Sequence, residues 1–455
     1  MSTVTLPELG LFADWIRATD DHAEHHLKLL ARVERAWDST AAGAPAERIS
    51  LAQKVERWRY QHLHEHAGAL TPQDEALVDA LDGAARQLAG RGHLAPRQTR
   101  HAVHDPKLDT ESIRQACAAL DPSYPLSKLI GRARQLTQLH FPGAAGSRPE
   151  HAAGHRTLLY APVYVSSDCV NYCLYCGFRY PRQIARRHLS AAESLDQARI
   201  LGQRGFRHIL IVGGEFPSRT TPAYYREIIR ALAADGFEVN IETAPQTTDA
   251  YAELVAAGAC GLSLYQETYD ETLYAKYHIR GPKTSYHWRL ETQDRAAEAG
   301  MPRLGFGILL GLAEPRADLL AMLRHAAYLA DRFPDRILAF SLPRIHEAPG
   351  GFQIPHAVSD EDLVRFYCCL RIAFPQAFLV LSTREQAELR DMLAKICITQ
   401  MSAGSSTAPG GYAADGSACA DSDAQFPLSD HRSPAEVAAR LEQEGIEVTW
   451  TTSRT

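Results

Sequence analysis

Residues 168–178 read DCVNYCLYCGF and carry three cysteines, Cys169, Cys173 and Cys176, within eight residues. Three thiolates at this spacing can hold three irons of a four-iron cluster or three corners of a zinc site. Structural zinc normally takes four protein ligands, and no further cysteine or histidine follows at the spacing of a zinc finger. A four-iron cluster held by three cysteines keeps one iron open for another ligand. The pattern therefore favours an iron–sulfur centre, with a zinc knuckle or buried thiols as the alternatives.

Composition and charge argue against several classes of protein. The chain has 455 residues, of which 45% are hydrophobic and 22% are charged, and its formal net charge is -6. This charge argues against general nucleic-acid binding. Residues 1–20 lack the pattern of a secretory signal, and no apolar run approaches the roughly 20 residues of a membrane span. The nine cysteines are unevenly spaced and do not suggest a disulfide framework, so we expect a cytoplasmic, oxygen-sensitive protein.

Residues 1–105 have the pattern of an α-helical region. Apolar residues recur at helical spacing between Leu27 and Trp37 and between Leu77 and Leu88. Two pairs of histidines lie four residues apart on the predicted helices: His22 with His26, and His62 with His66. Such a pair occupies one helix face and could bind a metal, although solvated or helix-capping histidines are the simpler account. Residues 106–154 predict a second helical segment followed by a linker rich in glycine, alanine and proline.

Strand-like and helix-like stretches alternate over residues 155–455. Eight β-branched runs predict strands at Leu158–Val165, His208–Val212, Glu238–Ile241, Gly261–Tyr265, Leu304–Leu310, Ile337–Ser341, Phe378–Leu381 and Ile398–Ser402. Amphipathic stretches between and after them predict helices, for example at Ala191–Arg204, Ala223–Ala234 and Asp318–Arg332. This alternation indicates parallel strands with right-handed crossovers. It predicts an α/β fold, a (β/α)8 TIM-type barrel with a C-terminal helical tail and an α-helical N-terminal extension, although six units with two extra elements would also fit.

Polar residues follow nearly every predicted strand. They are Ser166, which leads into the cysteines, Gly213-Gly214-Glu215, Glu242, Gln266–Tyr269, Ser341–Arg344, Ser382–Glu385 and Ser402–Thr407. In such barrels the chemistry takes place at the C-terminal ends of the strands. One buried charge at a strand end could be an ion pair without a function. Polar groups at nearly all strand ends instead predict an active site at this mouth.

At these residues the sequence resembles a known family, the radical S-adenosylmethionine (SAM) aromatic amino-acid lyases. The cysteine spacing, with the aromatic Tyr175 before the last cysteine, is typical of radical SAM enzymes. Members include the iminoacetate (dehydroglycine) synthase of thiazole biosynthesis, the tyrosine lyase of iron–iron hydrogenase maturation and, more distantly, a tryptophan-acting indolic acid synthase. The matching stretches span about residues 155–450: Cys169–Phe178, Tyr265–Tyr269, Trp288–Thr292, Asp294-Arg295, Ser382–Glu385, Met401–Tyr412, Gln425-Phe426 and Asp430–Pro434.

The resemblance implies a role for each polar group of the site. For the cofactors, one 4Fe–4S cluster and SAM, it implies cluster ligation by Cys169, Cys173 and Cys176, and SAM contacts from Tyr175 (adenine), Gly213, Gly214 and Glu215 (amino group), Glu242 or Gln266 (ribose) and Arg289 (carboxylate). For the substrate carboxylate it implies a clamp formed by Arg344, with Tyr164 and Ser341 nearby. A salt bridge at the barrel mouth is the alternative role for Arg344.

The resemblance also implies a reaction. A deoxyadenosyl radical would take hydrogen from the amino group of free L-tyrosine, and cleavage of the Cα–Cβ bond would give p-cresol and dehydroglycine (2-iminoacetate). L-Tryptophan or a modified tyrosine is the alternative substrate. A non-catalytic iron–sulfur binding or assembly partner is the alternative of another class. The implied partners are a small aromatic amino acid and an electron donor such as flavodoxin or ferredoxin, with no nucleic acid and no membrane; the N-terminal helices could dock another protein.

Two departures from the family carry expectations of their own. The hydrogenase-maturation enzymes continue into a domain with a second cluster, whereas no cysteine follows Pro434 here, so we expect glyoxylate and ammonia rather than carbon monoxide and cyanide. The N-terminal extension matches no motif with a chemical role. We therefore expect deletion of residues 1–105 to leave formation of deoxyadenosine largely intact.

Overall fold

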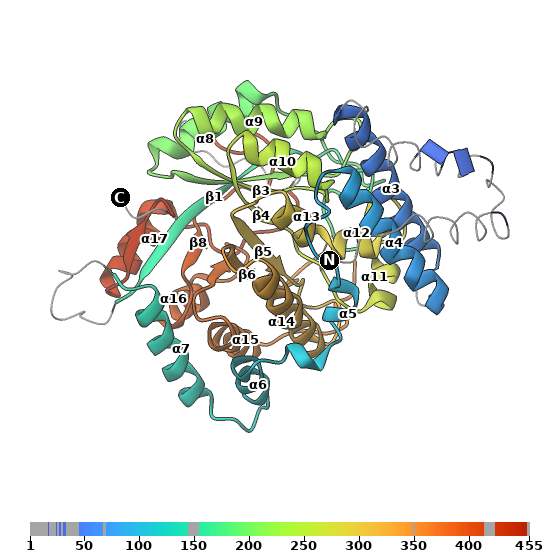
Figure 1. Cartoon of the computed structure of the whole chain (residues 1–455). Helices are drawn as coiled ribbons and strands as arrows, with labels where there is room; N and C mark the ends of the chain where they lie inside the picture. Colours follow the sequence, from blue (N-terminus) through green and yellow to red (C-terminus); the bar gives the residue numbers. More distant parts are fainter. Residues whose placement is uncertain are drawn as a thin grey trace. The chain divides into compact units, whose positions relative to one another are not determined.

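The computed structural model describes residues 45–66, 70–143, 154–348, 351–413 and 424–452, with a few positions between residues 17 and 32 (Figure 1). The chain divides into two units, one of Met1–Gln98 with Ser285–Glu291 and the other of Thr99–Thr284 with Thr292–Thr455. His22, His26 and residues 144–153 of the predicted linker lie outside the described residues. Among the described residues, no helix has both the length and the apolarity needed to cross a membrane.

The second unit is built on a parallel sheet that closes into a barrel. Its strands run β2-β3-β4-β5-β6-β7-β8-β1-β9 across the sheet, and β2 also pairs with β1, so that β1–β8 form the predicted closed barrel. Within the described residues the strands are β1 (Arg156–Ser166), β2 (His208–Gly213), β3 (Glu238–Glu242), β4 (Ala259–Ser263), β5 (Arg303–Gly307), β6 (Ile337–Ser341), β7 (Phe378–Leu381), β8 (Gln400–Ser402) and β9 (Glu447–Thr449). The strand β9 was not predicted; it pairs with residues 156–158 at the start of the long strand β1.

Helices follow the strands and lie on the outside of the sheet (Figure 1). Those of this unit are α5 (Thr99–Ala102), η1 (Pro106–Leu108), α6 (Glu111–Ala118), α7 (Leu126–His140), α8 (Ala191–Gln203), α9 (Pro222–Ala234), α10 (Thr248–Ala256), α11 (Glu271–Tyr277), η3 (Pro282–Thr284), α13 (Thr292–Glu298), α14 (Pro315–Arg332), α15 (Asp360–Ala373), α16 (Ala387–Ile396) and α17 (Pro434–Gln443). Capping explains where several of them begin. Ser190 and Ser433 each form a capping box with the glutamate three residues on, at the starts of α8 and α17.

Two predicted strands continue beyond the regular ladder that the structure contains. The predicted strand Gly261–Tyr265 corresponds to β4, which ends at Ser263, and the predicted strand Leu304–Leu310 corresponds to β5, which ends at Gly307. Hydrogen bonds still join the two segments, because Gln266 N–H donates to the carbonyl of Gly307 at 3.0 Å. Beyond the regular strand, Glu267 adopts φ of 72°, in the left-handed region, and forms an isolated parallel bridge with Ile308.

Side chains from strands around the barrel meet in its interior. One buried cluster combines Tyr160 and Tyr164 of β1, Leu210 and Val212 of β2, Ala339 of β6, Val380 of β7 and Phe178 of the cysteine loop. Cys169 and Cys176 pack against this cluster. The interior of the barrel is therefore continuous with the loop that carries the cysteines.

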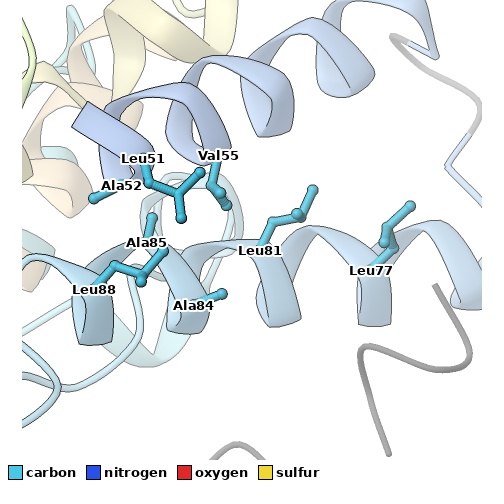
Figure 2. Close-up of a cluster of buried hydrophobic side chains, with 8 residues drawn as sticks. All are labelled: Leu51, Ala52, Val55, Leu77, Leu81, Ala84, Ala85 and Leu88. Atoms are coloured by element: carbon cyan, nitrogen blue, oxygen red, sulfur yellow. The ribbon is translucent and has the colours of Figure 1, made fainter. Parts of the chain in front are cut away.

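The first unit is built on two helices, α3 (Pro45–Glu65) and α4 (Pro72–Leu88), which confirms the predicted helical character of the N-terminal extension. Their buried contact consists of Leu51, Ala52 and Val55 from α3 and Leu77, Leu81, Ala84, Ala85 and Leu88 from α4 (Figure 2). The short helix α12 (Tyr286–Leu290) belongs to the same unit, although it begins 198 positions after the end of α4 in the chain. Trp288 of α12 packs edge-on against Tyr60 of α3, with ring centroids 4.9 Å apart.

The predicted histidine pair on α3 has a structural environment. The rings of His62 and His66 lie 4.2 Å apart, and His62 Nε2 lies 3.2 Å from a carboxylate oxygen of Asp74, the N3 residue of the α4 capping box. Burial and the charge of His66 lower the pKa of His62, while Asp74 and Glu65 act to raise it. No group of three or more potential metal ligands converges anywhere in the part of the chain that the structure describes. His62 therefore contacts the aspartate that takes part in capping α4.

Candidate active site

The cysteine loop follows β1 and is anchored to several other segments of the barrel. Its backbone N–H groups donate to carbonyl oxygens far along the chain: Val170 to Glu215 at 2.9 Å, Tyr172 to Arg280 at 3.0 Å, Leu174 to Tyr277 at 3.1 Å and Gly177 to Gln425 at 3.1 Å. Four anchors on residues that follow the strands β2, β4 and β8 leave the loop little freedom. The loop is therefore held across the barrel mouth, where its three cysteines were predicted to lie.

The three cysteines influence one another electrostatically. Burial raises the pKa of the Cys169 thiol, and the nearby Cys176 raises it further. Burial also raises the pKa of Cys173; Cys176 and Cys169 act in the same direction, while the ammonium group of Lys283 opposes them. A group of buried thiols becomes thiolate when a cationic centre binds it. Three cysteine thiolates can ligate three irons of a four-iron cluster and leave the fourth iron open, so this donor set fits such a cluster.

The ends of β1 and β2 approach closely beside the cysteines. Gly214 N–H donates to the carbonyl of Ser166 at 2.9 Å, and a Cβ atom on Gly214 would lie 2.4 Å from the carbonyl oxygen of Asp168. Only glycine permits this approach. It brings the carboxylate of Glu215 to the cysteine loop, where it accepts a hydrogen bond from the Asn171 side chain at 2.6 Å. A carboxylate here can accept a further hydrogen bond from a ligand amino group.

The end of β4 and the loop after it supply a second polar wall. The side-chain nitrogen of Gln266 is buried and has no hydrogen-bond partner, so it is an unused donor at this position. Glu267 pairs with the ammonium group of Lys283 at 2.6 Å, and Lys283 lies over the ring of Tyr175. The hydroxyl of the buried Tyr175 lies 2.8 Å from His278 Nε2. The side-chain N–H group of Gln266, which has no partner, is suited to donate to a hydroxyl group of a bound ligand.

Phenolic hydroxyls gather inside the barrel around two opposite charges. Burial and the charge of Glu242 raise the pKa values of Tyr160, to about 12, and of Tyr164 and Tyr265, to well above their usual value. The positive charge of Arg384 acts on the same three phenols in the opposite direction. Glu242, at the end of β3, and Arg384, after β7, are therefore both near enough to influence these phenols.

The predicted substrate residues form different contacts from one another. Ser341, at the end of β6, hydrogen-bonds to Tyr265, and the Tyr164 hydroxyl donates to the side-chain oxygen of Gln425 at 2.8 Å. Arg344 donates from Nε to Glu385 at 3.1 Å and from Nη1 to the carbonyl of Val358 at 2.9 Å, and its Nη2 contacts Glu385 and also Asp360 at 2.8 Å.

Arg344 thus occupies a salt bridge at the barrel mouth. Burial acts to lower its pKa, but the hydrogen bonds and charge of Glu385, together with Asp360, raise it overall. His346 adds a further contact, since its Nε2 lies 3.2 Å from Glu385. All three guanidinium nitrogens are engaged within the protein. A substrate carboxylate would have to displace Glu385 or Asp360 to bind here.

Arg384 is the candidate residue that the sequence analysis named only as part of a strand-end stretch. Its guanidinium carbon lies 3.6 Å from the centroid of the Phe426 ring, a cation–π contact. None of the described carboxylates forms an ion pair with it. It directly precedes Glu385, so the sequence signal, an arginine after β7 within Ser382–Glu385, was as strong as that for Arg344.

The remaining predicted site residue, Arg289, belongs to α12 in the first unit. Its backbone N–H donates to the carbonyl of Ser285 at 3.2 Å. The other predicted residues, from the cysteines to Ser341 and Arg344, belong to the second unit. Their strand-end positions agree with those expected from the sequence.

Comparisons with known proteins agree with this architecture. Residues 163–326 match the radical SAM superfamily, and residues 341–447 match the biotin and thiamin synthesis associated domain. A 2-iminoacetate synthase of Escherichia coli is 34% identical over 326 residues, which cover 71% of this chain and 82% of that protein. The iron–iron hydrogenase maturase HydG of Carboxydothermus hydrogenoformans has a solved structure that superposes with a TM-score of 0.67 at 29% identity, covering 90% of this chain and 86% of that one. Methylornithine synthase, at 20% identity and a TM-score of 0.58, shares the fold.

Radical SAM enzymes use a four-iron cluster and SAM, and the buried thiols, the unused Gln266 donor and the glycine-lined approach to Glu215 suit both groups. The sequence match covers most of the 2-iminoacetate synthase, and the structural match covers most of the maturase. The chain is a radical SAM enzyme and belongs to the carbon–carbon lyase family of 2-iminoacetate synthase.

Proposed function

We propose that the protein cleaves the Cα–Cβ bond of free L-tyrosine to give p-cresol and dehydroglycine. The observation that carries this proposal is Arg384, which lies over the Phe426 ring and forms an ion pair with none of the described carboxylates; both Arg384 and Glu242 influence the phenols Tyr160, Tyr164 and Tyr265. A free amino acid carries an ammonium and a carboxylate group, and the two side chains complement these two charges. The identity of 34% to a 2-iminoacetate synthase supports the same chemistry.

The cysteine loop is the proposed site of the cofactors. Cys169, Cys173 and Cys176 would ligate one 4Fe–4S cluster, which together with SAM supplies a deoxyadenosyl radical when both are bound. The residues that would hold SAM are Gly213, Gly214 and Glu215 at its amino group, Gln266 at its ribose, Tyr175 near its adenine and Arg289 at its carboxylate. The free donor of Gln266 and the close glycine backbone at Gly214 support these roles.

Arg384 is the proposed partner of the substrate carboxylate. Its planar guanidinium can donate two parallel hydrogen bonds to a carboxylate, and no described acid competes for it. Arg344, which the resemblance suggested for this role, instead ties the segment after β6 to Glu385, the neighbour of Arg384. In this arrangement Arg344 and Glu385 fix the backbone that carries Arg384. Tyr164 and Ser341 then line the same interior as hydrogen-bonding groups.

A fixed carboxylate decides which substrate atom reacts. The nitrogen and the Cα–H of an amino acid are neighbours, so a small rotation exchanges them in front of a radical. Binding both charged ends, at Arg384 and Glu242, removes that rotation. The buried Tyr160 and Tyr164 also keep water away from the reacting atoms.

Partners and location complete the proposal. The reductant is an electron donor of the flavodoxin or ferredoxin class, and the reaction takes place in the cytoplasm. The helices α3 and α4 would offer a docking surface for a protein partner. Tryptophan and modified tyrosines remain the competing substrates, and one assay separates them.

The test is an anaerobic assay on reconstituted full-length protein with tyrosine, tryptophan or no amino acid, in which deoxyadenosine, phenolic and indolic products are measured together. The wild type should form p-cresol from tyrosine in step with deoxyadenosine, and Cys173→Ala should form neither. Arg384→Lys keeps the charge but loses the two-pronged contact, at a cost of about 1.5–3 kcal/mol, so deoxyadenosine should form without matching p-cresol. Arg199→Lys, at an exposed ion pair, is the control and should behave as the wild type.

Two outcomes would overturn these assignments. Indolic products from tryptophan, with no p-cresol from tyrosine, would refute the substrate. If Arg384→Lys still forms p-cresol in step with deoxyadenosine while Arg344→Lys does not, the substrate carboxylate binds to Arg344 and not to Arg384.

A further inference from the structure

The side chain of Gln425 connects a cysteine of the loop with a phenol of the barrel interior. Its Nε2 atom lies 3.8 Å from Cys176 Sγ, within the range of a hydrogen bond to sulfur, and its Oε1 atom accepts a hydrogen bond from the Tyr164 hydroxyl at 2.8 Å. Gln425 lies about 250 residues after Cys176 in the chain. The fold thus brings an amide between the cysteine loop and the proposed substrate cavity.

Chemistry determines the direction of both hydrogen bonds. A thiolate that binds iron can only accept, so the amide must present its N–H₂ group to sulfur and its oxygen to Tyr164. The phenol must then donate. The Tyr164 hydroxyl lies 2.8 Å from the Gln425 oxygen, as this orientation of the amide requires.

Backbone contacts hold Gln425 in this position from both sides. Its carbonyl accepts from Gly177 N–H at 3.1 Å, and its own N–H donates to the carbonyl of Thr407 at 3.1 Å. A Cβ atom on Gly177 would lie 2.5 Å from the carbonyl oxygens of both Ala424 and Gln425, so only glycine permits this approach. The Gln425 amide is therefore supported rather than free to rotate away.

Residues further along the tail hold the same segment against the barrel. The backbone N–H groups of Ser429 and Asp430 both donate to the carbonyl of Thr383, which directly precedes Arg384. Asp430 is buried and forms an ion pair with the fully buried Arg390. The segment that presents Gln425 is thus attached to the end of β7.

We propose that Gln425 is a positioning residue that donates a hydrogen bond to the Cys176 ligand of the cluster and so raises the reduction potential of the cluster. This inference rests on the proposed role of Cys176 as a ligand. A hydrogen bond to a ligating sulfur withdraws negative charge from it and stabilises the reduced form, which carries one more electron. Tyr164 holds the amide in the donating orientation, so the phenol contributes indirectly.

Potentiometric titration of the reconstituted full-length protein, without SAM and without amino acid, tests the inference. The reduced cluster is followed by electron paramagnetic resonance, and iron content and circular dichroism are recorded for each variant. Gln425→Leu removes both hydrogen bonds at nearly constant volume and should make reduction less favourable, by about tenfold in the equilibrium constant, or about 59 mV for one electron. Gln425→Glu keeps the shape and an acceptor for Tyr164, removes the N–H donor and adds a negative charge, so it should shift the potential in the same direction and by more than Gln425→Leu.

Gln197→Leu is the matched control. The amide of Gln197 also bridges two groups, since its Nε2 donates to the carbonyl of Tyr412 at 3.1 Å and its Oε1 accepts from Tyr412 N–H at 2.9 Å, but it contacts no cysteine. The control should leave the potential unchanged. An unchanged potential in Gln425→Glu at normal iron content overturns the inference, as do equal shifts in the Gln425→Leu and Gln197→Leu variants.

The two levels of proposal fail in different ways. If the wild type takes up no four-iron cluster, the assignment of Cys176 is at fault, and the proposed function fails with it. If the cluster forms and Gln425→Leu keeps the wild-type potential, Gln425 alone is misassigned. Should Gln425→Leu fail to load iron, the isosteric Gln425→Glu variant decides by its potential. Lyase activity enters neither result.

Discussion

A buried ion pair in the first unit offers the most direct test of how α12 is held. Arg59 on α3 donates from Nη1 to Glu291 at 2.5 Å and from Nη2 at 2.9 Å, and the Tyr60 hydroxyl donates to the same carboxylate at 2.6 Å. The side chains of Arg59 and Glu291 are 1% and 0% exposed. Arg59→Met keeps the aliphatic volume but leaves Glu291 a buried carboxylate without its main partner. Removal of one member of a buried pair costs about 3–5 kcal/mol.

The pH dependence of this deficit follows from the pKa of Glu291. Burial acts to raise that pKa, but the charge and hydrogen bonds of Arg59, with Arg97 and Tyr60, lower it far below its usual value. In the wild type, the stability contributed by the pair is fully present above the unfolded-state pKa of about 4.3 and is lost as the pH falls below it. In Arg59→Met the pKa of Glu291 rises, so the folded variant binds a proton at the Glu291 carboxyl group at a higher pH than the wild type does. The deficit should therefore be largest near neutral pH, begin to shrink as the pH falls through the raised pKa of Glu291 in the variant, and shrink further below about pH 4.3.

Hydrogen exchange is the suitable assay because a chain of two units need not unfold in one step. Amides of α3, α4 and α12 should exchange about 10²–10⁴-fold faster in Arg59→Met, which corresponds to the same 3–5 kcal/mol. Arg57→Met on the same helix is the control, since Arg57 is exposed and reaches only the carbonyl of Gln53 at 3.3 Å. The control should change the free energy by less than about 0.5 kcal/mol. Equal protection in both variants would refute the importance of the pair.

This pair also changes the expectation for a truncated protein. Deletion of residues 1–105 would remove Arg59 and Tyr60 and leave Glu291 and Trp288 without the partners that they have in the first unit. The segment Ser285–Glu291 includes Arg289, the proposed partner of the SAM carboxylate. We therefore now expect the truncated chain to lose SAM cleavage along with the order of α12, contrary to the expectation from the sequence.

Two further predictions concern the second unit. Gly177→Ala would place a methyl group 2.5 Å from two carbonyl oxygens, so it should lower the free energy of unfolding by about 1–3 kcal/mol and reduce iron uptake on reconstitution. The control Gly131→Ala, with no atom within 4 Å of the new group, should change neither quantity. Normal iron uptake in Gly177→Ala would contradict this prediction. Burial raises the pKa of Asp318 to about 7 even though it accepts hydrogen bonds from Thr268 and Tyr269. The folded state therefore holds this proton more tightly than the unfolded state, so Asp318 lowers stability as the pH rises from about 3.9 to about 7. In Asp318→Asn, the free energy of unfolding measured with urea should depend less on pH across that range. If its pH dependence stays as in the wild type, Asp318 is excluded as the cause.

Local patterns predicted the barrel and its cofactor loop well. The alternation of apolar residues predicted each of the strands β1–β8, and the cysteine spacing predicted the centre that the family match supports. Both features are local, because side-chain periodicity and loop spacing are set by residues within one turn or one strand of each other. The short strand β9 could not be predicted, because three residues are too few to show an alternation of apolar and polar side chains.

Side-chain interactions between residues that are distant in the sequence could not be predicted from local patterns, and only the tertiary structure identified them. An arginine after a strand looks the same whether its partner is a glutamate of the protein or the carboxylate of a substrate. The fold pairs Arg344 with Glu385, which is 41 residues away in the chain. Arg384 forms an ion pair with none of the carboxylates that the structure describes, and it lies over the Phe426 ring. The fold likewise joins Arg59 to Glu291 across 232 residues and Gln425 to Cys176 across 249. Side-chain pairing at such separations depends on how the elements pack, and no periodicity within the chain records it.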